Sequence, residues 1–240
     1  MAEAKTRWRR AVAKTIAQQP RSAPSGALGI WVIVRGQIPK DMLEDIRREL
    51  TADEVAELYK RVHKMTAPAA TEPAALFVFG PPAVGKTSLA NARATELFGS
   101  PSNAVLVDGS EIRDVHGGFQ AVAAHGHARA ILHADAWSVL KKTKVTTTMK
   151  NRVFLEAIAD RQNILIPECA TDTAKLEQML NALIAAGFHI HAEALWAPVS
   201  ETRARGEPRS LREGKLWTPA QYKGSVRGAT EPATPDLISH

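Results

Sequence analysis

The 240-residue chain has one cysteine, few aromatic residues and no long apolar run. A lone Cys169 excludes an internal disulfide and fits a reducing compartment. No apolar run approaches the roughly 20 residues that a membrane-spanning helix needs. The first ten residues also lack the apolar centre of a secretory signal. These absences predict a cytoplasmic protein that does not enter a membrane.

Charge and hydrophobicity narrow the class of protein and its partners further. Hydrophobic residues make up 45% of the chain, which supports a sizeable core and argues against global disorder. Lysine and arginine number 31 against 25 acidic residues, so the formal net charge is +6. A basic balance favours anionic partners such as nucleotides, nucleic acid or acidic lipid, but it does not choose among them. No nucleic-acid-binding motif accompanies the charge, so we do not expect nucleic acid as a partner.

The most informative stretch is residues 80–88, which read Gly-Pro-Pro-Ala-Val-Gly-Lys-Thr-Ser after an apolar run at 75–79. Gly-x4-Gly-Lys-Thr between a strand and a helix is the pattern of a phosphate-binding loop. Its glycines let backbone N–H groups face a phosphate, Lys86 reaches the β- and γ-phosphates, and the Thr87 hydroxyl ligates Mg²⁺. We predict ATP and Mg²⁺ as ligands. The predicted nucleotide-binding residues are Gly80, Pro81, Pro82, Ala83, Val84, Gly85, Lys86, Thr87 and Ser88.

The first 70 residues predict a mainly helical segment. Residues 1–20 have the spacing of a basic amphipathic helix, and 28–34 fit a strand or the start of a buried helix. Helices are expected over 40–50 and from Thr51, where Thr51 and Glu54 form a capping box; Leu58, Val62 and Met65 continue the second helix's apolar stripe.

The remainder alternates between strands and helices, which predicts a parallel sheet with helices on both faces. The expected strands are 75–79, 104–107, 164–166 and 188–197. The expected helices are 86–98, 111–136, 146–161 and 173–186, with interruptions near Gly117 and Gly126.

Acidic residues follow two of these strands. Asp108 comes directly after 104–107, and Glu168 comes shortly after 164–166. Because ligands of parallel sheets bind at the carboxyl ends of the strands, we expect Gly80, Asp108 and Glu168 at one edge of the sheet.

The segment after Asp108 carries the residues that phosphoryl transfer needs. A carboxylate must orient or deprotonate the acceptor hydroxyl, and cations must hold the spreading phosphate charge. Asp108 and Glu111 supply acid and Arg113 supplies charge. The alternative is an ordinary capped helix with an exposed arginine. Beside a phosphate-binding loop we favour catalysis, with Lys86, Asp108, Glu111 and Arg113 as candidate catalytic residues.

Several arginines cluster after the fourth strand. On one helix they could close over a triphosphate as an arginine finger does, or they could form a solvated surface with the glutamates between them. The histidines have no metal-ligand spacing, so Mg²⁺ is the only metal expected. The candidate phosphate-binding arginines are Arg205, Arg209 and Arg212, with Arg203 as an alternative in register.

Taken together, residues 80–88, 107–113 with His116 and Phe119, 164–168 and the later arginines resemble the zeta toxin family. Its relatives include chloramphenicol phosphotransferase and polynucleotide kinase, and the resemblance covers about residues 72–225. It implies a P-loop kinase fold that uses ATP and Mg²⁺ to phosphorylate a hydroxyl. The best-known acceptor in the family is UDP-N-acetylglucosamine, and a small helical antitoxin often blocks the ATP site.

The resemblance divides the chain and assigns further residues. Together with the helical pattern of the first 70 residues, it predicts a helical extension over 1–70, a kinase domain over 71–228 and a flexible tail over 229–240. Lys86 and Thr87 match the family's phosphate and Mg²⁺ residues. The candidate substrate-binding residues are Ser110, His116, Glu156 and Glu168.

The chain departs from the family pattern at several positions. The family reads Asp-x-Asp-x-apolar-Arg/Lys-x-x-His-Pro, with the second Asp as catalytic base. Ser110 stands at the position of that base, and Gly117 stands where the proline is expected. Ala83 replaces a usual glycine of the loop, and Cys169 begins the segment where Gly-Thr is expected.

The serine leaves three alternatives open, because a hydroxyl is not a base near neutral pH. Asp108 or Glu111 takes the role of the base, or the acceptor differs, or the chain binds ATP without efficient turnover. The leading hypothesis is a kinase that acts on a nucleotide-containing small molecule. The alternatives are a non-catalytic nucleotide-binding effector and a kinase for a dinucleotide or polynucleotide end.

Overall fold

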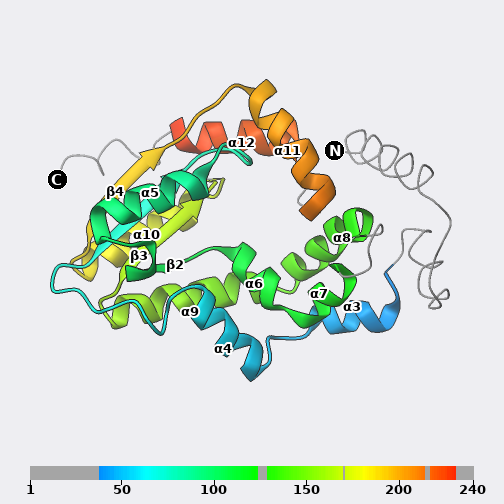
Figure 1. The fold of residues 1–240 in the computed structure, drawn as a ribbon, viewed down its shortest axis with the longest axis horizontal. Coiled ribbons are helices and arrows are strands. Elements are labelled where there is room, and N and C mark those ends of the chain that lie inside the picture. Colours follow the sequence, from blue (N-terminus) through cyan, green and yellow to red (C-terminus); the bar gives the residue numbers. More distant parts are fainter. Residues whose placement is uncertain (1–37, 124–128, 170, 214–216, 231–240) are drawn as a thin grey trace. The chain divides into compact units, whose positions relative to one another are not determined.

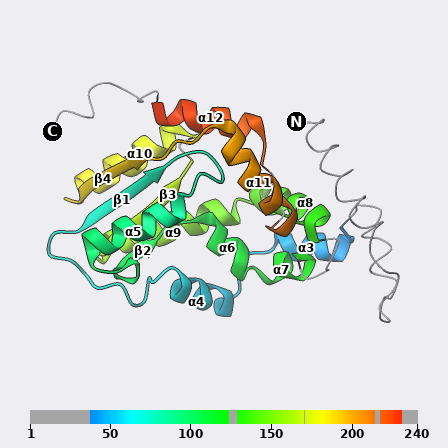
Figure 2. The ribbon, with the colours of Figure 1, turned by 45° about the horizontal axis from the view of Figure 1, so that its top comes forward.

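The computed structural model describes residues 38–123, 129–169, 171–213 and 217–230 (Figures 1 and 2). The helix expected over 1–20, the apolar segment 28–34 and the tail from residue 231 lie outside the described residues. Chain contacts divide the protein into two units. The first comprises the described parts of Met1–Glu57, Gly109–Met149 and Gly206–Thr218, and the second those of Leu58–Asp108, Lys150–Arg205 and Pro219–His240.

The second unit is built on a parallel sheet flanked by helices, which confirms the predicted α/β class (Figure 1). The strands are β1 (Ala74–Phe79), β2 (Ala104–Leu106), β3 (Asn163–Glu168) and β4 (His189–Ala194). Their order is β2-β3-β1-β4 and all neighbours are parallel, so β1 lies between two strands that come much later in the chain. All four predicted strands are present, although β4 ends at Ala194 and not at residue 197.

The register of β1 places the ends of the strands side by side. Phe79 pairs with Glu168 of β3 on one side and with Ala194 of β4 on the other. Beyond the end of β2, the Val107 N–H donates to the Leu165 carbonyl at 2.9 Å. The carboxyl ends of all four strands therefore form one edge, which the loop after β1 shares.

Helix α5 (Lys86–Phe98) has the predicted bounds and packs against the sheet. Its buried Ala90 and Ala94 lie in one core with Leu76, Val78 and Leu165. Small side chains on this face allow the helix to approach the strands closely, so the start of α5 is fixed relative to β1. The unit also contains η1 (Pro101–Asn103), α10 (Thr173–Ala185) and α12 (Pro219–Thr230).

The first unit is helical, with a separate core. Fully buried Ile46, Phe119, Val122 and Leu140 form its centre, and Val145 is also buried there. The helices are α3 (Lys40–Arg47), α6 (Gly109–Val115), α7 (Gly117–Ala123) and α8 (Arg129–Lys142). Three more helices contribute residues to both units: α4 (Ala52–Arg61), α9 (Val145–Ala159) and α11 (Val199–Glu213).

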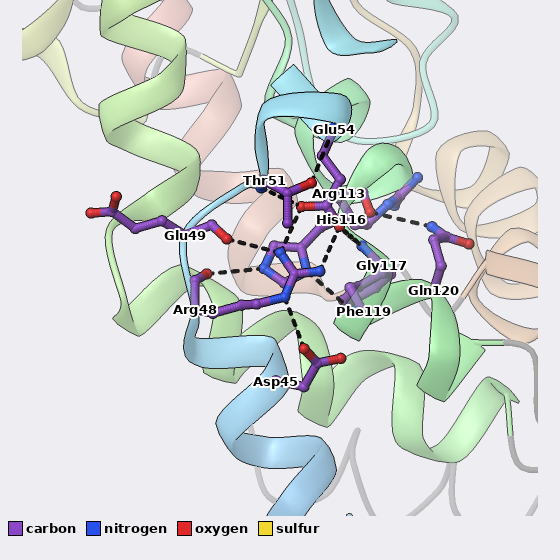
Figure 3. A network of polar contacts seen from close by, with 10 residues as sticks. All are labelled: Asp45, Arg48, Glu49, Thr51, Glu54, Arg113, His116, Gly117, Phe119 and Gln120. Carbon is purple, nitrogen blue, oxygen red and sulfur yellow. Dashed lines mark hydrogen bonds and ion pairs between the residues drawn. The ribbon is translucent and has the colours of Figure 1, made fainter. Parts of the chain in front are cut away.

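Within the first unit, Glu54 is the centre of a polar network (Figure 3). Its carboxylate accepts two hydrogen bonds from Arg48, each 2.6 Å long, and one from the Gly117 N–H at 2.6 Å. It also accepts from the Thr51 N–H at 2.8 Å, while the Thr51 hydroxyl accepts from the Glu54 N–H at 3.2 Å. These last two bonds confirm the predicted capping box. The Arg48 Nε donates to Asp45 at 2.8 Å.

The interruption expected near Gly117 is present, because α6 ends at Val115 and α7 begins at Gly117. Other sequence expectations need correction. Met65, expected in the apolar stripe of the second helix, is 67% exposed because α4 ends at Arg61. Helix α12 was not expected. Among the described residues, no helix is both long and apolar enough to cross a membrane.

The Glu54 network predicts a specific pH dependence of stability. Hydrogen bonds from Arg48, opposed by burial, lower the pKa of Glu54 from 4.5 to about 2. Since the folded-state pKa lies below the ordinary value, the stabilisation is complete above pH 4.5 and is lost as the pH falls towards 2. Glu54→Gln should therefore lower the unfolding free energy by about 2 kcal/mol at neutral pH and flatten its acid dependence.

Urea unfolding at a series of pH values measures this effect. Glu49→Gln is the matched control, because Glu49 is an exposed neighbour whose substitution should change little. Equal acid slopes for wild type and Glu54→Gln would contradict the role given to the network.

Candidate nucleotide-binding site

The loop between β1 and α5 has the backbone that phosphate binding requires. Gly80 has φ +152°, Ala83 +65° and Gly85 +108°, all in the region that favours glycine. A Cβ on Gly80 would also lie 2.6 Å from the Leu195 carbonyl oxygen, so the neighbouring strand leaves no room for a side chain. At Gly85 a Cβ would meet nothing within 4 Å, so the backbone angle alone calls for glycine there and the loop is open at that point.

Lys86 lies over the loop. Its ammonium donates to the carbonyls of Gly80 at 2.8 Å and Pro81 at 3.1 Å, and it lies 3.4 Å from the Cys169 sulfur. Thr87 and Ser88 are exposed in the first turn of α5. That turn carries no acidic residue, so the positive end of the helix dipole is not offset locally. A loop of this form can hold a phosphate through N–H groups and one mobile cation.

Glu168 closes β3 beside this loop. One carboxylate oxygen accepts from the Lys150 ammonium at 2.8 Å, and the other accepts from the Cys169 N–H at 2.9 Å. Burial alone would raise the pKa of Glu168, but Lys150 and the backbone N–H outweigh it and lower the pKa. Glu168 is therefore held as a carboxylate. Asp108 lies at the same edge. It follows Val107, whose N–H bonds the Leu165 carbonyl of β3 just beyond the end of β2.

The residues after Asp108 belong to the first unit. Ser110 and Glu111 lie in the first turn of α6 and are partly buried. Arg113 is buried, and its Nε donates to Asp114 at 2.6 Å. The Arg113 guanidinium also lies 6.0 Å from the ring of Phe119 and 5.9 Å from the ring of Trp137. These contacts give Arg113 a packing role, and they compete with the phosphate role predicted for it.

The substrate role predicted for His116 is not supported by its surroundings. The ring is fully buried, its Nδ1 accepts from the Phe119 N–H at 3.3 Å, and its Nε2 lies 3.2 Å from the Arg48 carbonyl (Figure 3). With Nδ1 accepting, Nε2 carries the proton and donates to that carbonyl. His116 thus caps the start of α7 and joins it to the end of α3. The neighbouring Gly117 uses its N–H to bond Glu54, which a proline would lack.

Glu156, another predicted substrate residue, lies on α9 and is held by two side chains of its own unit. Tyr59 donates to one carboxylate oxygen at 2.5 Å, and Arg152 donates to the other at 2.9 Å. Burial alone would raise the pKa of Glu156, but these two hydrogen bonds outweigh it and lower the pKa. Burial and the Glu156 carboxylate in turn raise the pKa of Tyr59 to about 12.

The structure brings one of the predicted arginines against the loop. Arg205 on α11 donates to the Val84 carbonyl at 3.3 Å and to Glu201 at 2.9 Å. Arg209 follows on the same helix but belongs to the first unit, and the Arg212 side chain lies outside the described residues. Arg205 is therefore the candidate phosphate-binding arginine that the structure supports, because its guanidinium contacts the loop.

Sequence reasoning missed Lys150 and Tyr59. Lys150 lies 18 residues before Glu168, and Tyr59 lies 97 residues before Glu156. No local spacing connects such pairs, because a side-chain contact between distant segments depends on how helices pack on the sheet.

The fold and the loop define an α/β protein with a P-loop at the carboxyl edge of its sheet. The chain belongs to the zeta toxin family, whose model matches residues 57–228. The match begins before the predicted domain start at residue 71 and includes Tyr59, so it takes in part of the segment predicted as an extension. The domain boundaries themselves stay a prediction. No curated protein matches the chain.

Solved structures give the same fold. One similar chain comes from the molecular and structural characterization of the PezAT chromosomal toxin-antitoxin system of the human pathogen Streptococcus pneumoniae. It is 14% identical in sequence and has a TM-score of 0.55. The similarity covers 68% of this chain and 64% of that chain.

Ala83 provides a test of the loop's backbone. An L-residue at positive φ is strained, so Ala83→Gly should raise the free energy of unfolding by about 0.5–1 kcal/mol, after the entropy cost of glycine. Ala92→Gly, on an exposed turn of α5, is the matched control and should lower it by about 1 kcal/mol. Urea unfolding curves of the two variants measure this contrast, and a loss of stability in Ala83→Gly would contradict the observed loop conformation.

Proposed function

We propose that the protein is an ATP-dependent kinase that transfers the γ-phosphate to a hydroxyl of a nucleotide-containing small molecule. An acceptor of the UDP-N-acetylglucosamine type is the form we favour. The observation that carries the proposal is the position of Lys86, folded over a glycine-rich loop at the edge where Glu168 and Asp108 also lie. Membership of the zeta toxin family supports the same reaction class.

The donor side of the reaction rests on the loop. Backbone N–H groups of the loop and the start of α5 would hold the phosphates. Lys86 would exchange two neutral carbonyl partners for charged phosphate oxygens, which form stronger hydrogen bonds. Arg205, which already contacts the loop at Val84, would approach the same phosphates from α11.

Mg²⁺ would be held chiefly by the phosphates and by water, as is usual in phosphoryl-transfer sites. Thr87, exposed in the first turn of α5, would supply a protein ligand. The described residues contain no group of three or more His, Cys, Asp or Glu that could hold a metal ion, and such a group is not needed for this arrangement. Bound Mg²⁺ would neutralise charge that develops on the transferred phosphoryl group.

The acceptor side would use carboxylates. Glu168 is ionised and fixed beside the loop, so it can accept a hydrogen bond from an acceptor hydroxyl. Asp108 at the same edge, or Glu111 in the first turn of α6, would orient or deprotonate that hydroxyl.

A second candidate function is a nucleotide-binding effector with little or no turnover. The observation that favours it is Ser110, at the position where the family has its catalytic base. A serine hydroxyl cannot take the acceptor's proton near neutral pH unless another group first deprotonates the serine. We further propose a small antitoxin-like protein as a partner in either case, supported by the toxin–antitoxin system to which the similar structure belongs.

Replacement of Lys86 tests the donor side. Lys86→Ala should lower ATP-dependent phosphoryl transfer by roughly 100-fold or more, because it removes a preorganised cation. Lys142→Ala, at an exposed position near the end of α8, is the control and should leave transfer unchanged. Labelled ATP with a panel of nucleotide sugars, dinucleotides and oligonucleotides measures the rate. Full transfer by Lys86→Ala would rule out this mechanism.

Replacement of Ser110 separates the kinase from the effector. If the missing base limits turnover, Ser110→Asp should raise kcat by at least about tenfold, since a positioned general base contributes 10²–10⁴-fold. Ser110→Asn is the matched control, because it has the same shape and is not a base. The result to look for is a rise in the first variant alone. Equal rates in both would show that Ser110 does not stand where a base acts.

A further inference from the structure

Three lysines act on the end of β3, two of them through direct contacts and one through its charge. Lys150 bonds the Glu168 carboxylate at 2.8 Å, and Lys86 lies 3.4 Å from the sulfur of the next residue, Cys169. Lys175, on α10, is near enough that its charge helps to lower the pKa of Glu168. All of these residues belong to the second unit, so the cluster is internal to it.

The carboxylates of the cluster do not balance the lysines. Glu168 already has both oxygens engaged, one by Lys150 and the other by the Cys169 N–H. The second carboxylate, Asp172, accepts from the backbone N–H of Lys175 at 3.1 Å and caps α10. Within the cluster, three ammonium groups thus stand against two carboxylates, and Asp108 at the end of β2 is a further carboxylate of the same edge.

Lys175 has an electrostatically unfavourable position. It lies in the first turn of α10, where the helix dipole repels a cation. Burial and the nearby Lys150 charge lower its pKa, while Glu168 and Asp172 only partly oppose them. An ammonium held against a helix start and a second ammonium gains stabilisation when an anion arrives between them.

We propose that Lys150 and Lys175 form a second phosphate-binding position, beside the P-loop at the end of β3, that holds a phosphoryl group of the acceptor. The inference rests on the proposed kinase function and specifies its substrate as an anion. A nucleotide-containing acceptor carries such a group in its diphosphate. The other source of the same chemistry is the γ-phosphate of ATP, since Lys86 adjoins the cluster.

The experiment compares Lys175→Gln, Lys175→Arg and wild type by calorimetry. Pyrophosphate is titrated into protein saturated with a non-hydrolysable ATP analogue, and the analogue and ADP are titrated separately. We expect Lys175→Gln to bind pyrophosphate about tenfold more weakly and Lys175→Arg to restore most of the affinity. ADP affinity should not change. Lys223→Gln, on an exposed turn of α12, is the matched control.

The arms of the experiment separate the sources of the phosphate. A loss of affinity for pyrophosphate alone assigns the position to the acceptor. A loss of affinity for the ATP analogue, with the ADP affinity unchanged, assigns the position to the γ-phosphate and overturns the acceptor role. Unchanged affinities, or no pyrophosphate binding by wild type, overturn the position altogether. Retained binding of ADP in any of these cases keeps the P-loop and the proposed function separate from this result.

Chemical modification gives a readout that a structural lysine would not. Lysines 150 and 175 should be protected from acetylation by pyrophosphate, with Lys223 unprotected, as read by peptide mass spectrometry. Equal acetylation of the pair with and without pyrophosphate would overturn the inference even if Lys175→Gln folds poorly.

Discussion

The pairing of β1 on both sides is the constraint on which the site depends. Phe79, the last residue of β1, is bonded within the ladder between Glu168 and Ala194. The chain must then turn at Gly80 directly against the Leu195 carbonyl, which explains the glycine. Helix α5 is fixed to the same strand through Ala90 and Ala94. The loop is therefore held at both ends by the core, and its N–H groups need little reorganisation to meet a phosphate.

The same edge holds Lys86 and Lys150 together with the carboxylates of Glu168 and Asp108. Among the described residues, Lys86 bonds two carbonyls and a sulfur, while Lys150 neutralises Glu168. Because these groups are partly buried, their interactions are screened less than those of surface charges. A cation that is bonded only to neutral groups can turn to a phosphate, which is what the proposed nucleotide supplies.

The sequence predicted the features that depend on neighbouring residues. The strand, loop and helix around Lys86 follow from apolar runs and glycine spacing, and the capping box at Thr51 follows from a four-residue pattern. Family resemblance placed Glu156 and His116 near a substrate, but the structure surrounds each with structural partners. A sequence pattern gives the residue at a position, and it does not give the side chains that distant helices bring to it.

The contacts made between distant segments could not be predicted. Whether Glu168 faces Lys150, or Glu156 faces Tyr59, depends on strand register and on how α4 and α9 pack. The glycines predict the break before Gly117, but they do not predict the bond from its N–H to Glu54, 63 residues earlier. The effect of Ser110 on turnover is a chemical question, and a measurement of activity decides it.

The central claim is that the chain transfers phosphate and does not merely bind nucleotide. The most direct test incubates wild-type protein with ATP, Mg²⁺ and a panel of nucleotide sugars and other hydroxyl-bearing nucleotides, and follows the products by mass spectrometry. The account predicts one acceptor that gains the mass of a single phosphoryl group as ADP is formed. Tight ATP binding with no phosphorylated acceptor would contradict it and favour the effector.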